Sequence, residues 1–292
     1  MRICSFLPSG TEMVCALGLT DHLVGVSPDC DYPPEVKTKP VVLKNALDLS
    51  ELSSRGLDRH VSDRLHKGEK LLRVDGRRLN ELRPDVVIAR AATDGEIPPV
   101  SKTLYLAPRT LEDIFENFRT VGNTTGTLDK AKDIVYDLRL RAMAAQCNAY
   151  RDKQIPRVAV LHWMDPPYLA GLWVPEMIEI AGGKPGPASA GKDSLPMTWD
   201  QLAEFNPDVV VCAPCGHHLA GAMKEAALLA KCPFPGKIGA FRDNRLYVVD
   251  GDAYINRPGP RVVDGIELLA HLLHPEFCTW SGPAAAFQKI AL

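Results

Sequence analysis

Residues 79–90, LNELRPDVVIAR, and residues 202–214, LAEFNPDVVVCAP, repeat one pattern. In each, a short amphipathic segment is followed by Pro-Asp and then by an aliphatic run, and Asp85 lies 123 residues before Asp208. Proline disfavours helical geometry in the residue before it, and a continuous aliphatic run is typical of a strand buried on both faces of a parallel sheet. Each stretch therefore predicts a step from helix to buried strand in an α/β domain.

The segments upstream of these two stretches also repeat. Residues 2–19 and 157–183 each predict a strand, a loop and a helix that carries a Glu-Met pair. The first helix is expected to end at Gly18 and the second at Gly182, since glycine is common just after a helix C-terminus. The chain is therefore expected to contain the same α/β plan twice, as two Rossmann-like lobes with parallel sheets.

A long helical segment, residues 127–156, separates the two copies. Its apolar positions fall near helical spacing, and they are Ala131, Ile134, Val135, Leu138, Leu140 and Met143. This helix is either a surface helix on one lobe or a rigid link between two lobes, and the duplication favours the link. We predict an N-terminal lobe over 1–124, a connecting helix over 125–154 and a C-terminal lobe over 155–292.

Composition excludes several classes of protein. Among the 292 residues, 46% are hydrophobic and 24% are charged, which is ordinary for a folded protein. A net charge of −2 argues against a nucleic-acid binder, because phosphate contacts need a concentrated basic surface. No apolar run is long enough to insert into a membrane. The eight cysteines are irregularly spaced, so mostly reduced thiols are expected.

The N-terminal residues, MRICSFLPSGTE, lack the basic, apolar and small-residue pattern of a secretory signal. As written, the sequence therefore predicts a cytoplasmic protein. A start codon further upstream would instead allow a periplasmic or membrane-surface location.

Several motifs, taken in order and spacing, resemble the cobalamin-type (class III) substrate-binding proteins of ABC importers, which bind vitamin B12 or iron chelates. They are LPSGTEMVCALGL (7–19), LVGVSPDCDYPPEV (23–36), LNELRPDVVIA (79–89), DPPYLAG (165–171), PEMIEIAGG (175–183) and DGDAYINRPGPRVVDGIELLAHLLHPE (250–276). The resemblance implies two α/β lobes joined by one helix, with a ligand in the cleft between them. It also implies that a carboxylate on each lobe docks an ABC permease, and Glu96 and Asp200 match those positions. Arg90 and Ser194 stand where the best-known vitamin B12 binder has aromatic residues.

Ligands of parallel sheets collect at the carboxyl ends of the strands, and the loops expected there contain aromatic residues. Such rings could sandwich a flat ligand, or they could pack locally under long loops. The candidates are Tyr32, Trp163, Tyr168, Trp173 and Tyr254.

Four polar residues are further ligand-binding candidates. Arg90, directly after its strand, would suit a carboxylate or phosphate, or pair with an acid such as Asp94. Arg257 has the same two interpretations. Ser9 or Thr11 would cap the first helix, whose backbone N–H groups could alternatively hold an anionic ligand group.

The stretch CAPCGHH (212–218) contains a possible metal or tetrapyrrole site formed by Cys212, Cys215, His217 and His218. The alternatives are a structural role, because Cys212 ends a buried strand, and a redox pair. His217 is also a candidate ligand contact.

No nucleotide-binding, zinc-protease or serine-hydrolase motif is present, so the sequence does not predict an enzyme. We expect a small-molecule binding protein of the ABC-importer type that holds a corrinoid or other metal chelate, needs no resident cofactor and has an ABC permease as a candidate partner. The alternative is an intracellular metal- or tetrapyrrole-handling protein or enzyme that uses the Cys/His cluster.

Overall fold

The computed structural model describes residues 1–45, 72–90, 97 and 102–291. The chain divides into two compact units, the first comprising residues 1–108 and 113–135 and the second residues 109–112 and 136–292. The predicted lobes over 1–124 and 155–292, with their connecting helix, stay predictions. We describe the two units separately.

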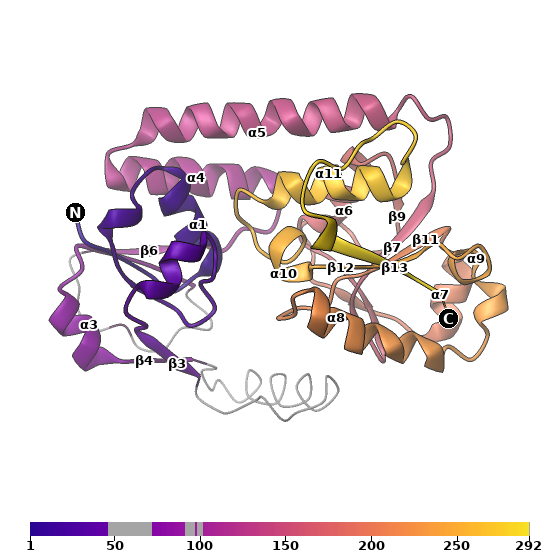
Figure 1. The fold of residues 1–292 in the computed structure, drawn as a ribbon, viewed down its shortest axis with the longest axis horizontal. Coiled ribbons are helices and arrows are strands. Elements are labelled where there is room, and N and C mark those ends of the chain that lie inside the picture. The colour runs from indigo at the N-terminus through magenta and orange to yellow at the C-terminus, as the bar shows by residue number, and fades with distance from the viewer. Residues whose placement is uncertain (46–71, 91–96, 98–101, 292) are drawn as a thin grey trace. The chain divides into compact units, whose positions relative to one another are not determined.

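Unit 1 contains a four-stranded sheet with strand order β2-β1-β5-β6, in which every neighbouring pair is parallel. Helices α1 and α4 lie on one side of it, and α3 with the antiparallel pair β3–β4 lies on the other (Figure 1). The elements are β1 (Ile3–Ser5), α1 (Pro8–Ala16), β2 (Leu23–Val26), β3 (Leu43–Asn45), β4 (Leu72–Val74), α3 (Gly76–Leu82), β5 (Val86–Ala89), β6 (Thr103–Tyr105) and α4 (Leu111–Thr125).

Successive side chains along the strands point to opposite faces of this sheet, and both faces are packed. Cys4 and Val87 pack with Leu79 of α3 in one core cluster. Toward the other face, a Cβ on Gly10 of α1 would lie 2.8 Å from Ile88 Cγ2, so α1 packs closely on the strands. The predicted buried strand after Asp85 is confirmed, because β5 is buried at all four positions.

Unit 2 contains a larger sheet with strand order β10-β8-β7-β11-β12-β13, and β9 also pairs with β7. Helices α6 and α11 lie on one side of it and α8 on the other (Figure 1). The strands are β7 (Arg157–Met164), β8 (Pro167–Leu169), β9 (Lys184–Pro185), β10 (Leu195–Pro196), β11 (Val209–Cys212), β12 (Leu246–Val249) and β13 (Phe287–Ile290). The helices of this unit that follow β7 are α6 (Val174–Ile180), α7 (Trp199–Phe205), α8 (Leu219–Ala226), α9 (Gly239–Arg242), α10 (Gly251–Tyr254) and α11 (Val262–Leu273).

Each of the two sheets contains the same arrangement of four parallel strands. The order β9-β7-β11-β12 in unit 2 matches β2-β1-β5-β6 in unit 1, and all of these pairs are parallel. The helix that follows the first strand of each unit is followed by a glycine with positive φ, +78° at Gly18 and +82° at Gly182. The predicted duplication is thus confirmed, as are both glycine positions.

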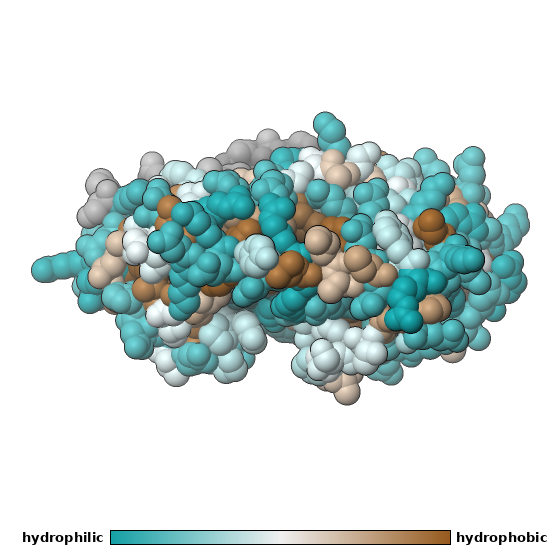
Figure 2. All heavy atoms as spheres, turned by 90° about the horizontal axis from the view of Figure 1, so that it is seen from above, coloured by the Kyte–Doolittle hydropathy of each residue, from teal (hydrophilic) through white to brown (hydrophobic). Residues whose placement is uncertain are grey.

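Helix α5 (Leu128–Ala149) occupies 22 residues of the predicted connecting segment. Its buried side chains recur every three or four residues, at Ala131, Val135, Leu138, Ala142, Ala145 and Ala149. Leu140 and Met143, in contrast, are exposed. Viewed from above α5, hydrophobic residues gather along the middle of the surface among hydrophilic ones (Figure 2). None of the described helices is long and apolar enough to cross a membrane.

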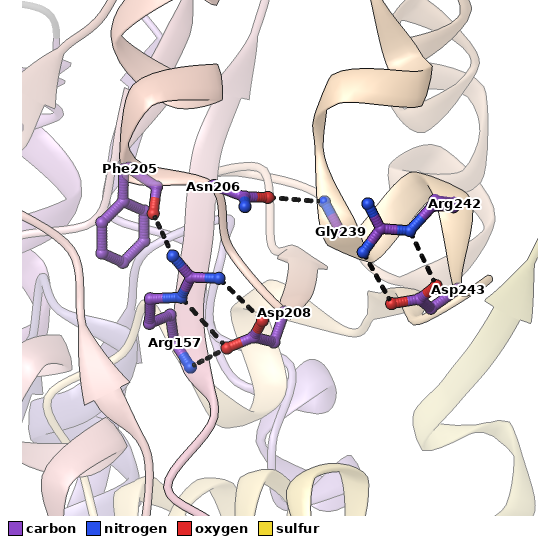
Figure 3. Close-up of polar contacts among 7 residues, drawn as sticks. All are labelled: Arg157, Phe205, Asn206, Asp208, Gly239, Arg242 and Asp243. Carbon is purple, nitrogen blue, oxygen red and sulfur yellow. Dashed lines mark hydrogen bonds and ion pairs between the residues drawn. The ribbon is translucent and has the colours of Figure 1, made fainter.

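Both Pro-Asp steps have the same local geometry. The residue that ends the preceding helix is left-handed, with φ of 44° at Arg83 after α3 and 48° at Asn206 after α7. Asn206 is held in place because its Oδ1 accepts a 2.7 Å hydrogen bond from the backbone nitrogen of Gly239 (Figure 3). Proline then prevents the helix from continuing, and the chain enters the buried strand.

The predicted side-chain cap of α1 is wrong. The N-cap position is Leu7, which has no side chain to accept a hydrogen bond, and Pro8 begins the helix. Proline suits the first helical position because its fixed φ is already helical. Ser9 and Thr11 therefore lie inside the helix and are both buried. Thr198, which caps α7 in a reciprocal capping box with Gln201, is one of the caps that sequence reasoning missed.

Five short 3-10 helices complete the described elements, at Thr20–His22, Pro34–Thr38, Ala227–Lys231, Pro235–Lys237 and Ala284–Ala286. The last of them leads into β13, which pairs antiparallel with β12 and so occupies the edge of the sheet. All eight cysteines are free thiols, as expected.

Candidate ligand-binding site

The loops at the carboxyl ends of β7, β11 and β12 bring polar and aromatic groups together in unit 2. His162 and Trp163 come from the end of β7, and Ala213 and Pro214 follow β11. Asn256 follows α10 and links these loops, because its Nδ2 donates to the carbonyl oxygens of Ala213 at 3.2 Å and Pro214 at 3.3 Å. This is the edge where parallel sheets bind ligands.

His162 is held as a neutral imidazole. Burial lowers the pKa of its ring to about 4, and the nearby Asn256 side chain opposes this shift. His162 Nδ1 lies 3.0 Å from the hydroxyl of Ser194, which also accepts a bond from the backbone nitrogen of Gly171. The ring is therefore oriented from one side, by a residue that sequence reasoning had noted only as a departure from an aromatic position.

Three residues at this edge of the sheet have a buried polar atom without a hydrogen-bond partner among the described residues: His162 Nε2, Trp163 Nε1 and Asn256 Oδ1. Although the Asn256 side chain lies near enough to raise the pKa of His162, the two groups do not meet the geometry of a hydrogen bond. Buried unpaired polar atoms are uncommon, and each costs about 1–3 kcal/mol. Their concentration at one edge of the sheet indicates a place where a partner is supplied from outside the chain.

Two aromatic candidates lie at the same edge of the sheet. Trp163 on β7 pairs in register with Tyr168 on β8, and both side chains are half-buried. Among the predicted aromatic contacts of unit 2, these two therefore retain accessible surface.

Trp173 and Tyr254 have packing roles instead. Trp173 is 5% exposed, and its Nε1 donates a 2.9 Å hydrogen bond to the carbonyl of Ile255. Tyr254 is 9% exposed and packs edge-on against Trp280, with ring centroids 5.6 Å apart. For both residues, the alternative of local packing is the one that the structure supports.

Arg257 and His218 are engaged with acids of the loop after β12. Arg257 Nη2 lies 3.8 Å from Asp252 Oδ2, and Asp252 also accepts from the backbone nitrogen of Gly216. His218 Nδ1 lies 3.0 Å from both carboxylate oxygens of Asp250. These contacts fasten the loop after β11 to the loop after β12.

The predicted Cys/His metal site is not assembled. Cys212 is fully buried in β11, and burial raises the pKa of its thiol to about 12. Cys215 is exposed, and His217 is half-buried. In the described part of the chain, no three His, Cys, Asp or Glu side chains form a group that could hold a metal ion.

The candidates of unit 1 are more dispersed. Arg90 follows β5 directly, as predicted, and is exposed, as is Tyr32. Thr11 Oγ1 lies 3.0 Å from the thiol sulfur of buried Cys30, so it is an internal contact of the unit. Asp94 and Glu96 lie outside the described residues, so the predicted roles of these two positions stay predictions.

A pocket of about 670 Å³ also lies in unit 2. Its lining runs from Arg157, which begins β7, and Phe205, which ends α7, to Leu195 and Pro196 of β10, which pair with β8. None of the three residues with unpaired polar atoms lines this pocket. We place the candidate site at the carboxyl edge on the chemistry of those atoms.

Sequence reasoning missed two residues of this site, His162 and Asn256. His162 lies within the strand pattern, where the expected side chain is a core residue. Asn256 lies in the recognised motif at residues 250–276, but its contacts to the loop after β11 cannot be inferred from local sequence. The only available signal was that polar residues stand at the ends of predicted parallel strands.

Residues 3–253 match the family described as periplasmic binding protein. The chain belongs to this family. A vitamin B12-binding protein of Vibrio parahaemolyticus is 26% identical over 91% of the chain and 86% of its own length. An uncharacterized ABC transporter substrate-binding lipoprotein of Bacillus subtilis, YvrC, is 24% identical over 94% of the chain and 80% of its own length.

Among solved structures of periplasmic binding proteins, the heme-binding protein RhuT from Roseiflexus is similar to this chain. Its TM-score is 0.69 at 23% sequence identity, covering 94% of this chain and 98% of RhuT. At that identity the likeness establishes the fold, and it confirms the predicted class III α/β architecture.

Proposed function

We propose that this periplasmic binding protein is the substrate-binding component of an ABC importer and that it binds a corrinoid. The observation that carries this proposal is the occurrence of three buried, unpaired polar atoms and the half-buried rings of Trp163 and Tyr168 at one edge of the sheet. The names of the relatives support a tetrapyrrole-like ligand, since they include vitamin B12-binding and heme-binding proteins.

The donor and acceptor character of the unpaired atoms favours a corrinoid over heme. Trp163 Nε1 is only a donor and needs an acceptor, whereas Asn256 Oδ1 is only an acceptor and needs a donor. The amide side chains of a corrinoid supply both, whereas the carboxylates of heme supply acceptors alone. Side-chain rotation, which is common on binding, would open these atoms to the ligand.

The flat faces of Trp163 and Tyr168 would supply apolar contact area to the macrocycle. Neutral His162 offers its Nε2 as a further hydrogen-bonding group or as a ligand to a chelated metal. The protein's part is binding and orientation, without catalysis. Recovery of the ligand chemically unchanged after incubation, measured by mass spectrometry, tests this last point.

Calorimetric titration with cobalamin, cobinamide and hemin tests the ligand class. We expect both corrinoids to bind more tightly than hemin. The variant Trp163→Phe keeps an aromatic ring but loses the N–H, so corrinoid affinity should fall about 5- to 10-fold, the equivalent of one hydrogen bond. The matched control is Trp199→Phe on α7, which should bind normally. Tighter binding of hemin, or no binding of either corrinoid by the folded protein, would contradict the proposal.

We propose an ABC permease as the partner, docked through Asp200 and Glu96. Support for Asp200 comes from its exposure in the first turn of α7, where the Thr198 capping box fixes the helix start. The variant Asp200→Arg should reduce uptake of the bound ligand in a reconstituted transporter, with ligand affinity unchanged. Glu204→Arg on the same helix is the control. Equal uptake by wild type and Asp200→Arg would remove Asp200 from the docking surface.

The cytoplasmic location stays a prediction. An importer component would work outside the cytoplasmic membrane, so location and proposed function constrain one another. Cell fractionation with an antibody to the native protein decides between the two locations.

A further inference from the structure

Helix α5 carries an exposed apolar stripe in addition to its buried one. Tyr136 is 63% exposed, Leu140 45%, Met143 54% and Tyr150 57%, and Cys147 between them is exposed as well. The backbone nitrogen of Tyr150 still bonds to the carbonyl of Gln146, so all five residues share one helical course. Hydrophobic residues are visible along this face of the molecule (Figure 2).

The spacing of the stripe is four, three, four and three residues, which is the heptad spacing of a coiled-coil seam. At 3.6 residues per turn, these positions lie on the side of α5 opposite Leu138, Ala142 and Ala145, which are buried. The described part of the chain therefore leaves the stripe uncovered. Single exposed apolar residues are ordinary, but five in a heptad register are typical of a helix that packs against another helix.

We propose that this stripe is the self-association surface of the protein, on which α5 of a second copy packs antiparallel about a two-fold axis at Met143. The two tyrosines of the stripe are symmetric about this residue, because Tyr136 and Tyr150 lie seven residues before and after it. In the antiparallel pair, Tyr136 of one copy faces Tyr150 of the other, and Met143 faces its own counterpart. An isologous contact needs such a self-complementary surface.

The charges beside the stripe favour the antiparallel direction. Asp137 and Arg151 flank it on the same side, near its two ends, and both are exposed. About the axis at Met143, position 137 of each copy lies opposite position 149 of the other, two residues from Arg151. The long arginine side chain spans this offset, so two ion pairs form. In a parallel pair, positions on the same side of the stripe would lie on opposite sides of the interface, so Asp137 and Arg151 would not meet.

The size of the stripe indicates a dimer of modest affinity. At roughly 200 Å² per ring, four tyrosines that are more than half exposed would cover about 480 Å². The leucines, methionines and flanking stems bring the buried area to roughly 1,000 Å², the low end for a specific interface. The dimer should therefore dissociate on dilution into the micromolar range.

Sedimentation velocity of the full chain over about 1 to 200 µM tests the association. We expect the mass to rise from monomer to dimer, and the double variant Leu140→Glu/Met143→Glu to remain a monomer. Asn148→Glu, an exposed position of α5 outside the stripe, is the matched control and should dimerise normally. A wild-type protein that is monomeric throughout this range, or an equal dimer in the double variant, would overturn the proposal.

Charge reversal tests the direction of packing. Asp137→Arg and Arg151→Asp should each weaken the dimer about 3- to 10-fold, and the double reversal should restore it. Because Arg151 also lies 5.5 Å over the Phe277 ring, circular dichroism melting of each variant accompanies the measurement. Absence of restoration in a folded double variant would rule out this pairing.

Disulfide trapping gives an independent readout. In a background with exposed Cys147 and Cys215 replaced by serine, Met143→Cys should cross-link two copies under oxidation. Tyr136→Cys should not, because its counterpart would lie about 21 Å away along the antiparallel helix. Cross-linking of Tyr136→Cys with itself would instead indicate a parallel pair and contradict the proposal.

Discussion

Asp208 holds the start of β7 by accepting hydrogen bonds from both the backbone and the side chain of Arg157. Asp208 Oδ2 lies 2.8 Å from the Arg157 backbone nitrogen, and Oδ1 lies 3.0 Å from Nη2 of its guanidinium (Figure 3). Arg157 Nη1 also donates to the carbonyl of Phe205, the last residue of α7. One arginine thus connects the first strand of unit 2 to the helix and the strand of the Pro-Asp step.

Unit 1 has a reduced version of this arrangement. Asp85 Oδ2 accepts a 2.7 Å hydrogen bond from the backbone nitrogen of Arg2, and Arg2 Nε donates to the carbonyl of Leu82 at the end of α3. We therefore expect Asp208→Asn to cost about 1–2 kcal/mol of unfolding free energy and Asp85→Asn less, since Asp208 accepts an additional charged donor. Denaturant unfolding of both variants measures the difference, and a larger loss at Asp85 would contradict this account.

The contribution of Asp208 should depend on pH. Hydrogen bonds from Arg157 hold the pKa of this carboxyl below its usual range. Its stabilisation is therefore present above the unfolded pKa of about 3.9 and is lost as the pH falls below that value. The gap in stability between wild type and Asp208→Asn should shrink between pH 5 and pH 3. Solvent screening keeps the effect small, because the side chain is 40% exposed.

His162 should make the protein less stable in mild acid. Its pKa is lowered to about 4 by burial, so the unfolded chain takes up a proton below about pH 6.5 that the folded chain does not. The stability should thus fall by about 3 kcal/mol between pH 6.5 and 4 on account of this residue. Unfolding curves of wild type and His162→Gln at pH 7, 5.5 and 4.5 measure this slope, and an equal slope in both would show that other groups cause it.

Two glycines with positive φ should respond differently to alanine. A Cβ on Gly182 would lie 2.7 Å from His274 Nε2 and 2.8 Å from Ala149 Cβ, whereas a Cβ on Gly216 would have no atom within 4 Å. Gly216→Ala should cost about 1 kcal/mol of backbone strain, and Gly182→Ala about 2–4 kcal/mol because overpacking is added. Thermal unfolding in parallel measures both, and equal losses would mean that the contacts around Gly182 relax freely.

Trp173 and Trp163 should separate stability from binding. Trp173→Phe removes a buried hydrogen bond to Ile255, so unfolding free energy should fall by about 2 kcal/mol while corrinoid affinity is retained. Trp163→Phe should lower corrinoid affinity and leave the unfolding free energy unchanged, because the N–H of Trp163 has no partner in the described part of the chain. Loss of affinity in a fully folded Trp173→Phe protein would return this residue to the binding site.

Local signals in the sequence were sufficient to predict the duplicated architecture. The aliphatic runs after Asp85 and Asp208 are buried strands, and the glycines at 18 and 182 follow helices, as predicted. These features depend on backbone preferences and hydrophobic pattern within a few residues. Such preferences act the same way wherever the segment lies in the fold, so they can be recognised without knowledge of the tertiary structure.

Long-range packing decided the rest. Trp173 is a core residue because Ile255, 82 positions away, accepts its hydrogen bond, and β13 exists because Phe287–Ile290 finds the edge of β12. The burial and missing partners of His162 depend on Ser194 and Asn256 in the same way. Burial and hydrogen-bond satisfaction are properties of the neighbours that folding brings together, and local sequence does not name those neighbours.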